Sequence, residues 1–220
     1  MCTFIVRTTR CVLLLLLVAS GAAFGQAQYE IGGNIGYGWY HNGTIYGPGG
    51  SATAGIHNGF AMGVVFGDDL YEYISGEIHY TYQVGNPFLT SGGKTQNIQG
   101  QSHTINYDLI GNFRRREEKV RPFFAVGVGA KGYIARGPIL VPQPFPTIAT
   151  LRDNDAWVVV ASVGGGVKYR INDHVLVRGD FRDYITPFPT QQLAPVLNGS
   201  VHGIFNQFTL TFGVSYLFWW

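Results

Sequence analysis

The strongest constraint on the fold is a strict alternation of residue types in the last thirteen residues, 208–220. Every second position is apolar, and the positions between them begin with small or polar residues. The apolar set is Phe208, Leu210, Phe212, Val214, Tyr216, Phe218 and Trp220. Side chains of a β-strand point alternately to opposite faces. The segment is therefore predicted to be one long strand with an apolar face and a mostly polar face.

Seven earlier segments show the same period of two. They span about residues 29–40, 52–66, 74–84, 104–113, 123–134, 157–170 and 175–182. Long loops, such as 41–50 and 86–101, alternate with short turns, such as Gly67-Asp68-Asp69, so each kind collects at one end of the molecule. No helical pattern of useful length competes. The sequence predicts an all-β fold, an eight-stranded antiparallel up-and-down transmembrane β-barrel.

The membrane assignment depends on which face of the strands points inward. A soluble lipocalin-like barrel would also have eight strands, but it would bury the apolar face. Here the polar face is crowded with glycine and serine and carries too few charges to solubilise an exterior. Aromatic residues also gather near both strand ends, as two girdles around a lipid-facing band: Trp39, Tyr82 and Trp157 toward the loops, and Phe66, Phe113, Tyr169 and Trp220 toward the turns.

The N-terminus is predicted to be a secretory signal peptide, residues 1–25, followed by one barrel domain, residues 26–220. Arg7 and Arg10 precede an apolar run that is too short to span a membrane, and small residues precede Gln26. Both cysteines lie inside this segment, so no disulfide or lipid anchor is expected. The 15 basic residues include these two arginines and stand against 13 acidic ones. The exported chain would be nearly neutral, which gives no reason to expect a nucleic-acid partner.

Together, the signal peptide, eight strands, alternating loops and closing aromatic strand resemble the small OmpA/OmpX-type outer-membrane barrel family. The resemblance implies a protein of the Gram-negative outer membrane that is exported by a Sec-type route and embedded in outer-membrane lipids. It also implies a C-terminal signal for the barrel-insertion machinery, carried by Phe212, Tyr216, Phe218 and Trp220. The sequence gives no reason to expect a peptidoglycan-binding domain. The family includes structural barrels, adhesins, solute conduits and lipid-modifying enzymes, so activity does not follow.

Charged residues on the inward face form the first candidate site. Residue parity places eight of them in the lumen: Glu77, His79, Asp108, Lys131, Lys168, Arg178, Asp180 and Arg182. Charges in so narrow a barrel are expected to be paired, because an unpaired buried charge costs several kcal/mol. The favoured interpretation is a salt-bridge plug. The alternative is a gate or proton-sensitive conduit with His79 as the switch.

Catalysis and bound cofactors are not expected. A lipid-A deacylase of this fold resembles a serine hydrolase with a lipid-facing His-x-Ser pair, whereas the nearest match here, His79-Tyr80-Thr81, points into the lumen by parity. The remaining histidines show no metal-ligand spacing.

A Pro-Phe-x-Thr motif occurs in three successive long loops, at residues 87–90, 144–147 and 187–190. Its phenylalanines, Phe88, Phe145 and Phe188, need apolar cover. They either pack locally against the barrel rim or meet as an apolar cap or docking surface for an extracellular partner. The predicted function is a structural or surface-interaction role with a plugged lumen and the long loops as the working surface. The alternative is a narrow pore or a conduit for small hydrophobic solutes.

Overall fold

The computed structural model describes residues 28–139, 141–201 and 203–219. The predicted signal peptide and Trp220 lie outside the described residues. In the described part of the chain, no helix has the length and apolar character needed to cross a membrane.

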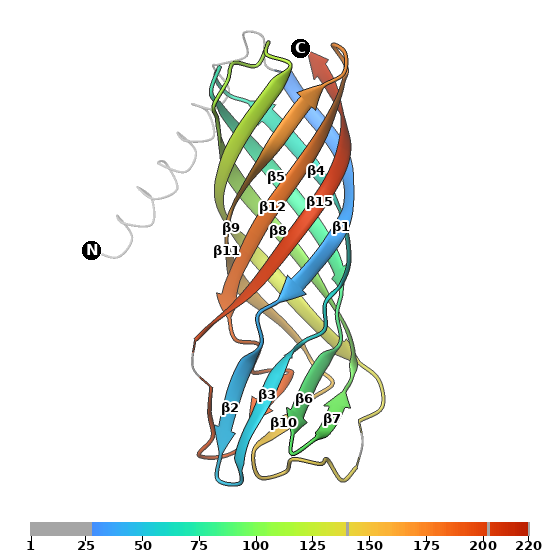
Figure 1. Ribbon diagram of the computed structural model, residues 1–220, viewed down its shortest axis with the longest axis vertical. Helices are drawn as coiled ribbons and strands as arrows, with labels where there is room; N and C mark the ends of the chain where they lie inside the picture. The colour runs from blue at the N-terminus through green and yellow to red at the C-terminus, as the bar shows by residue number, and fades with distance from the viewer. Residues whose placement is uncertain (1–27, 140, 202, 220) are drawn as a thin grey trace, which may run out of the picture.

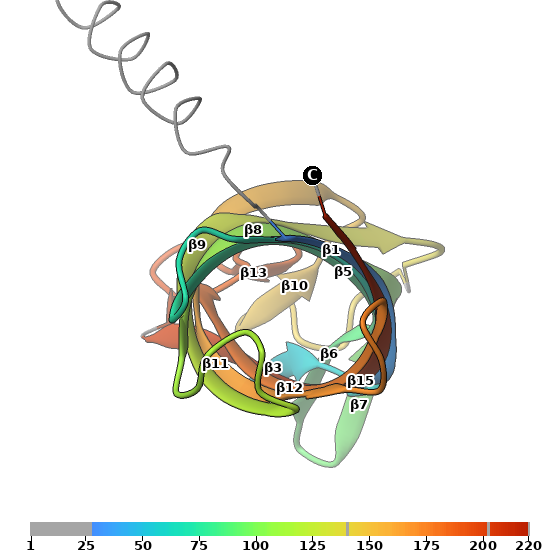
Figure 2. The same cartoon turned by 90° about the horizontal axis from the view of Figure 1, so that it is seen from above.

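Eight long antiparallel strands close into a barrel, which confirms the predicted fold (Figures 1 and 2). Around the barrel the order is β1-β15-β12-β11-β9-β8-β5-β4, so the first and last barrel strands pair and close it. The strands are β1 (Gln28–Tyr40), β4 (Gly59–Asp69), β5 (Ile74–Val84), β8 (Gln99–Asn112), β9 (Val120–Arg136), β11 (Asp155–Arg170), β12 (Val175–Pro187) and β15 (Ile204–Trp219).

The two faces of the barrel wall differ as the alternation predicts. Along β1, Ile35 is 60% exposed whereas its neighbour Asn34 is 7% exposed. Along β15, Phe212 is 63% exposed and Thr211 is 7% exposed. The apolar residues therefore cover the outside, and the small and polar ones fill the inside.

The long loops fold into sheets of their own beyond one end of the barrel (Figure 1). A five-stranded sheet has the order β14-β2-β3-β6-β7, and β10 pairs with β13. These strands are β2 (Gly43–Gly47), β3 (Gly50–Ile56), β6 (Pro87–Ser91), β7 (Lys94–Asn97), β10 (Ala149–Leu151), β13 (Leu193–Pro195) and β14 (Ser200–Val201). We call this loop structure the cap.

The boundaries of the second predicted strand were wrong. Residues 52–66 are two elements, because β3 leaves the barrel to pair with β2 and β6 while only β4 joins the barrel wall. Tyr40 donates its backbone N–H to the Asn58 side chain at 3.0 Å at this break. The predicted turn at Gly67-Asp68-Asp69 is also wrong, since β4 continues to Asp69 and the turn follows it. Alternation continues across the barrel rim, so it could not reveal where the barrel ends.

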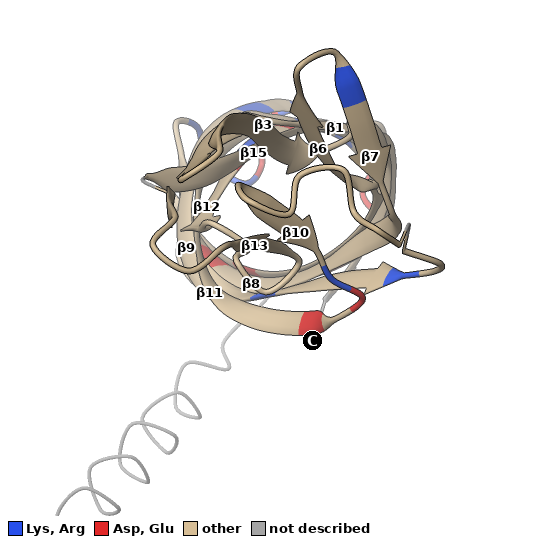
Figure 3. Ribbon diagram, turned by 90° about the horizontal axis from the view of Figure 1, so that it is seen from below, with Lys and Arg blue, Asp and Glu red and all other residues tan. Residues whose placement is uncertain are grey.

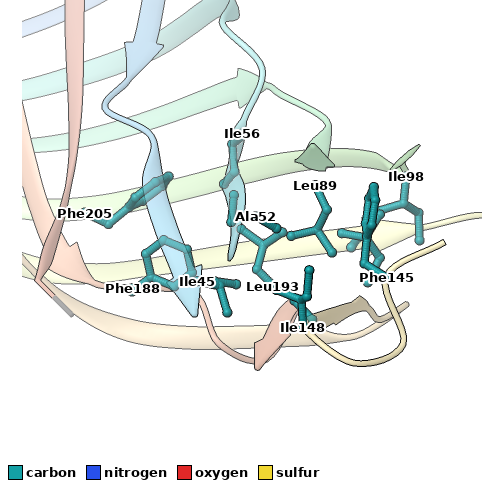
Figure 4. Packing of buried hydrophobic residues seen from close by; sticks show 14 of the residues in the cluster. Ile45, Ala52, Ile56, Leu89, Ile98, Phe145, Ile148, Phe188, Leu193 and Phe205 are labelled. Atoms are coloured by element: carbon teal, nitrogen blue, oxygen red, sulfur yellow. The ribbon is translucent and has the colours of Figure 1, made fainter. Parts of the chain in front are cut away.

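Apolar side chains from the loops and the barrel rim form a common core inside the cap (Figure 4). Ile45, Leu89, Leu151 and Leu193 are almost completely buried in it. Since this core lies over the loop end of the barrel, the cap is packed against the mouth of the lumen.

Candidate functional site: the lumen network and the cap

Arg178 on β12 is the centre of a buried ion-pair cluster in the lumen. Its guanidinium donates to Glu30 on β1 at 2.7 Å, to Glu77 on β5 at 2.8 Å and to Asp180 on β12 at 2.6 Å. The Arg178 side chain is completely buried. One cation therefore joins three strands of the barrel through hydrogen bonds to carboxylates, which are stronger than neutral ones.

Two further cations extend the cluster. Lys168 on β11 lies 2.7 Å from Glu30 and 2.5 Å from Glu77. Arg182 lies on the same face of β12, four residues after Arg178. Its guanidinium is 2.8 Å from Asp108 and 3.2 Å from Asp180. The ring of Phe123 lies under all three cations, with centroid distances of 5.6–5.8 Å. The interior is thus filled by paired charges that pack on one aromatic ring.

His79 joins the cluster through Glu77, with its Nε2 at 2.7 Å from the carboxylate. The cluster holds four carboxylates (Glu30, Glu77, Asp108 and Asp180) against three fixed cations, Lys168, Arg178 and Arg182. Its formal charge is −1 with a neutral His79 and zero with a protonated His79. A proton on His79 would therefore bring the formal charge of this cluster to zero.

The structure brings together seven of the eight predicted lumen residues and leaves out Lys131. The Lys131 ammonium is fully buried but lies between the rings of Tyr40, Tyr133 and Tyr184, at 5.0, 5.0 and 5.8 Å from the centroids. It has neither an ion pair nor a hydrogen-bond partner among the described residues. Aromatic faces, not carboxylates, therefore surround this cation.

Glu30 belongs to the cluster but was absent from the predicted set. It accepts hydrogen bonds from Lys168, Arg178 and Ser215 at 2.7 Å each. Its position in the first strand already had the parity of the inward face. Applying the same parity rule to β1 would have found it.

The turn end of the lumen is polar. Arg121 on β9 donates to Asp69 on β4 at 3.0 Å, and both are largely buried. A cavity of about 10 Å³ lies beside them, lined in part by Gln28, Ser75 and Lys168. That volume is close to the minimum for one water molecule.

At the loop end, the three motif phenylalanines do not share one environment. Phe145 and Phe188 lie in the cap core, and Phe188 packs edge-on against Phe205 at a centroid distance of 5.4 Å. Phe88 is half-buried outside this core and stacks on His57 at 4.5 Å. Two of the three therefore contribute to the cap core, and all three have local apolar contacts.

The closing strand presents its aromatic residues to the lipid side. Phe212 and Tyr216 are exposed on the outer face of β15, and Phe218 stacks on Tyr29 of β1 at 5.6 Å. The fourth residue of the predicted insertion signal, Trp220, lies outside the described residues. No group of three His, Cys, Asp or Glu side chains among the described residues could hold a metal ion.

Solved structures with this architecture are outer-membrane barrels. Neisserial surface protein A is 13% identical, with a TM-score of 0.51 over 87% of this chain and 98% of that one. OprG from Pseudomonas aeruginosa is 12% identical, with a TM-score of 0.57 over 88% of this chain and 96% of that one. At these identities the similarity concerns the fold alone. No curated protein matches the chain.

A family model described as an outer membrane protein beta-barrel domain matches residues 11–218. This range contains all eight barrel strands and the cap. The chain therefore belongs to the family of outer-membrane β-barrel proteins.

Proposed function

We propose that this protein is an occluded outer-membrane barrel whose working surface is the cap. The observation that carries the proposal is the buried ion-pair cluster centred on Arg178, which spans the lumen from β12 to β5 on the opposite wall. Breaking such a cluster to admit ions would leave buried charges without partners. The cap core, which lies over the loop mouth, supports a second barrier in series.

The cap also offers an outer surface for contacts. Few residues in the ribbon at this end are Lys, Arg, Asp or Glu (Figure 3). Tyr46 and Leu197 are exposed there, at 55% and 88%. Tyr46 lies opposite Ser200 in the pairing of β2 with β14, and Leu197 precedes β14 in the chain. Phe145 and Phe188 are buried and cannot contact a partner directly. A surface-interaction role of the cap would therefore use exposed residues such as Tyr46 and Leu197.

Conductance distinguishes the occluded barrel from the alternative, a narrow pore or solute conduit. The purified barrel would be refolded into a planar bilayer and recorded from acidic to neutral pH. We expect no unitary conductance at any pH. Stable unitary currents would overturn the proposal. Currents that change with pH in the wild type and lose that dependence in His79→Gln would instead support a proton-sensitive conduit with His79 as the switch.

The C-terminal strand is further proposed to be read by the insertion machinery. Phe212 and Tyr216 are exposed on the strand that closes the barrel. Tyr216→Ser should lower assembly in cells while leaving refolding in detergent micelles unchanged, measured by heat-modifiable gel mobility. Val167→Ser, at a lipid-facing position of β11, is the matched control. Equal loss of cellular assembly in both variants would contradict a specific signal.

A further inference from the structure

We propose that the outer face of β5, β8 and β9, at the loop end of the barrel, binds a saccharide-headed lipid of the outer leaflet. A groove of about 410 Å³ lies there, outside the barrel wall and away from the lumen network. Its apolar wall is formed by Tyr82, Val84 and Ile134. Its polar wall is formed by Asn86, Gln99, Gln101 and Arg136.

The strand register makes this groove continuous. Gln101 on β8 pairs with Val84 on β5 on one side and with Ile134 on β9 on the other. Two residues closer to the loops on the same face, Gln99 lies opposite Arg136. Val84 and Ile134 therefore flank the Gln101 amide at one level of the groove, and amide and charged side chains predominate closer to the loops.

A hydrogen-bonded polar chain lies on the lipid side directly below the amides. Tyr82 donates its hydroxyl to Gln101 at 2.9 Å, and Gln101 lies 3.3 Å from His103 Nε2. The other ring nitrogen of His103 lies 2.8 Å from the Tyr80 hydroxyl. Polar and ionisable groups on a lipid-facing surface are costly and are by default candidates for a functional site. We call the side chains of Tyr80, Tyr82, Gln101 and His103 the polar ledge. It lies at the level of the aromatic girdle.

The chemistry of the ledge and groove favours hydroxyl and amide groups over a simple phosphate. Arg136 is held by Asp155 through two hydrogen bonds of 2.5 Å and lies 3.4 Å from Asp153. These two carboxylates offset the cation, so its charge is not free to bind a phosphate. The carboxylates can accept hydrogen bonds from sugar hydroxyls, and the three carboxamides can both accept and donate. The Trp157 ring, 61% exposed and packed over Gly132 beside His103, offers an apolar face to a sugar.

An apolar path for the lipid tail continues from the groove. Toward the turns, the outer faces of β5 and β8 carry the exposed side chains Ile78, Ile105 and Tyr107. The groove and this apolar surface together match an amphiphile, with the headgroup beside Gln99 and Gln101 and the tail against the barrel wall.

The test measures lipid selectivity of the whole barrel in phosphatidylcholine nanodiscs. Lipid A and cardiolipin are added as competing probes, and the retained lipid is identified by native mass spectrometry. Both probes carry two phosphates and at least four acyl chains, and lipid A alone carries a saccharide, so a preference for lipid A reports a site for the saccharide. We expect the wild type to retain lipid A with a preference of about tenfold, equivalent to about 1.4 kcal/mol. The double variant Gln101→Leu, His103→Leu should lose this preference.

The matched control is His174→Leu. His174 also stacks on a lipid-facing tyrosine, Tyr216, at 5.7 Å, but it lies at the turn end. Equal retention of both lipids by the wild type, or an unchanged preference in the double variant, would overturn the proposal. If the double variant does not fold, NMR of the wild type decides: lipid A should shift the imidazole signals of His103 and leave those of His174 in place. An unmoved His103, or equal shifts of both, would reject the site.

Discussion

At the scale of single residues, the buried charges of the lumen divide into two kinds. Arg178 donates to carboxylates from three strands, whereas Lys131 is surrounded by tyrosine rings. Removing one partner from a buried ion pair leaves the other charge uncompensated, whereas replacing an unpaired buried charge removes its desolvation cost. The two cations should therefore respond oppositely to substitution.

Arg178→Ala should lower the free energy of unfolding by about 3–5 kcal/mol, because Glu30, Glu77 and Asp180 would lose their common cation. The measurement is urea unfolding of the refolded barrel in micelles. Arg115→Ala is the control, since its side chain is 62% exposed and pairs only loosely with Glu72 at 3.5 Å. That change should cost less than about 0.5 kcal/mol. Equal effects of the two substitutions would show that the cluster contributes nothing to stability.

Lys131→Met should leave the stability unchanged or raise it by about 1–4 kcal/mol, the range for apolar replacement of buried charges. Methionine has a similar length and would keep contact with the tyrosine rings. The same urea titration measures the effect. A loss of stability as large as that of Arg178→Ala would mean that the aromatic cage compensates the ammonium fully.

At the scale of secondary-structure elements, the pairing of β1 with β15 closes the barrel. The strands lie in register from Gln28 opposite Trp219 to Tyr40 opposite Gln207. Gly36 sits on the inner face of this seam, opposite Thr211, and a side-chain carbon there would collide with the backbone of Leu210 and Thr211. Gly33 faces the lipid, where a side-chain carbon would meet only the Gly63 carbonyl at 3.9 Å. The seam thus tolerates a methyl group on one face only.

Gly36→Ala should therefore impair folding of the barrel, whereas Gly33→Ala should fold like the wild type. Heat-modifiable gel mobility after refolding into micelles reports the closed barrel directly. The two substitutions add the same methyl group to the same strand, so β-propensity cancels in the comparison. Normal folding of Gly36→Ala would show that the seam can open by about an ångström without cost.

At the scale of the whole molecule, the proposed occluded barrel has two closures in series: the ion-pair cluster within the barrel and the cap core over its loop mouth. Phe145 lies in the cap core at 6% exposure, whereas Val141 in the same loop is 89% exposed. Losing a buried phenylalanine typically costs about 3–5 kcal/mol. Phe145→Ser should therefore loosen the cap without disturbing the strands of the barrel.

Because the closures act in series, Phe145→Ser alone should remain silent in the planar bilayer. Hydrogen exchange should nevertheless quicken at Ala149 and Leu151, and Val141→Ser should change neither measurement. Only Phe145→Ser combined with Arg178→Ala and Arg182→Ala should conduct. Conductance of Phe145→Ser by itself would show that the cluster does not block ions.

Local alternation was sufficient to predict the eight strands, their faces and most of the inward charges, because the side-chain period of a strand is a property of neighbouring residues. The same rule puts Glu30 on the face of Asn34, although Glu30 was not among the predicted lumen residues. Alternation could not show that the chain is outside the barrel wall between the end of β1 at Tyr40 and the start of β4 at Gly59. The strands in that segment, including β3, have the same side-chain period as the barrel strands. Nor could it pair side chains across the lumen. Which cation meets Glu77, and why Lys131 meets tyrosines, depends on the stagger of strands around a closed barrel. That stagger is fixed only when all eight strands are in register, so the tertiary structure alone decided the lumen network, the cap core and the groove on the outer face.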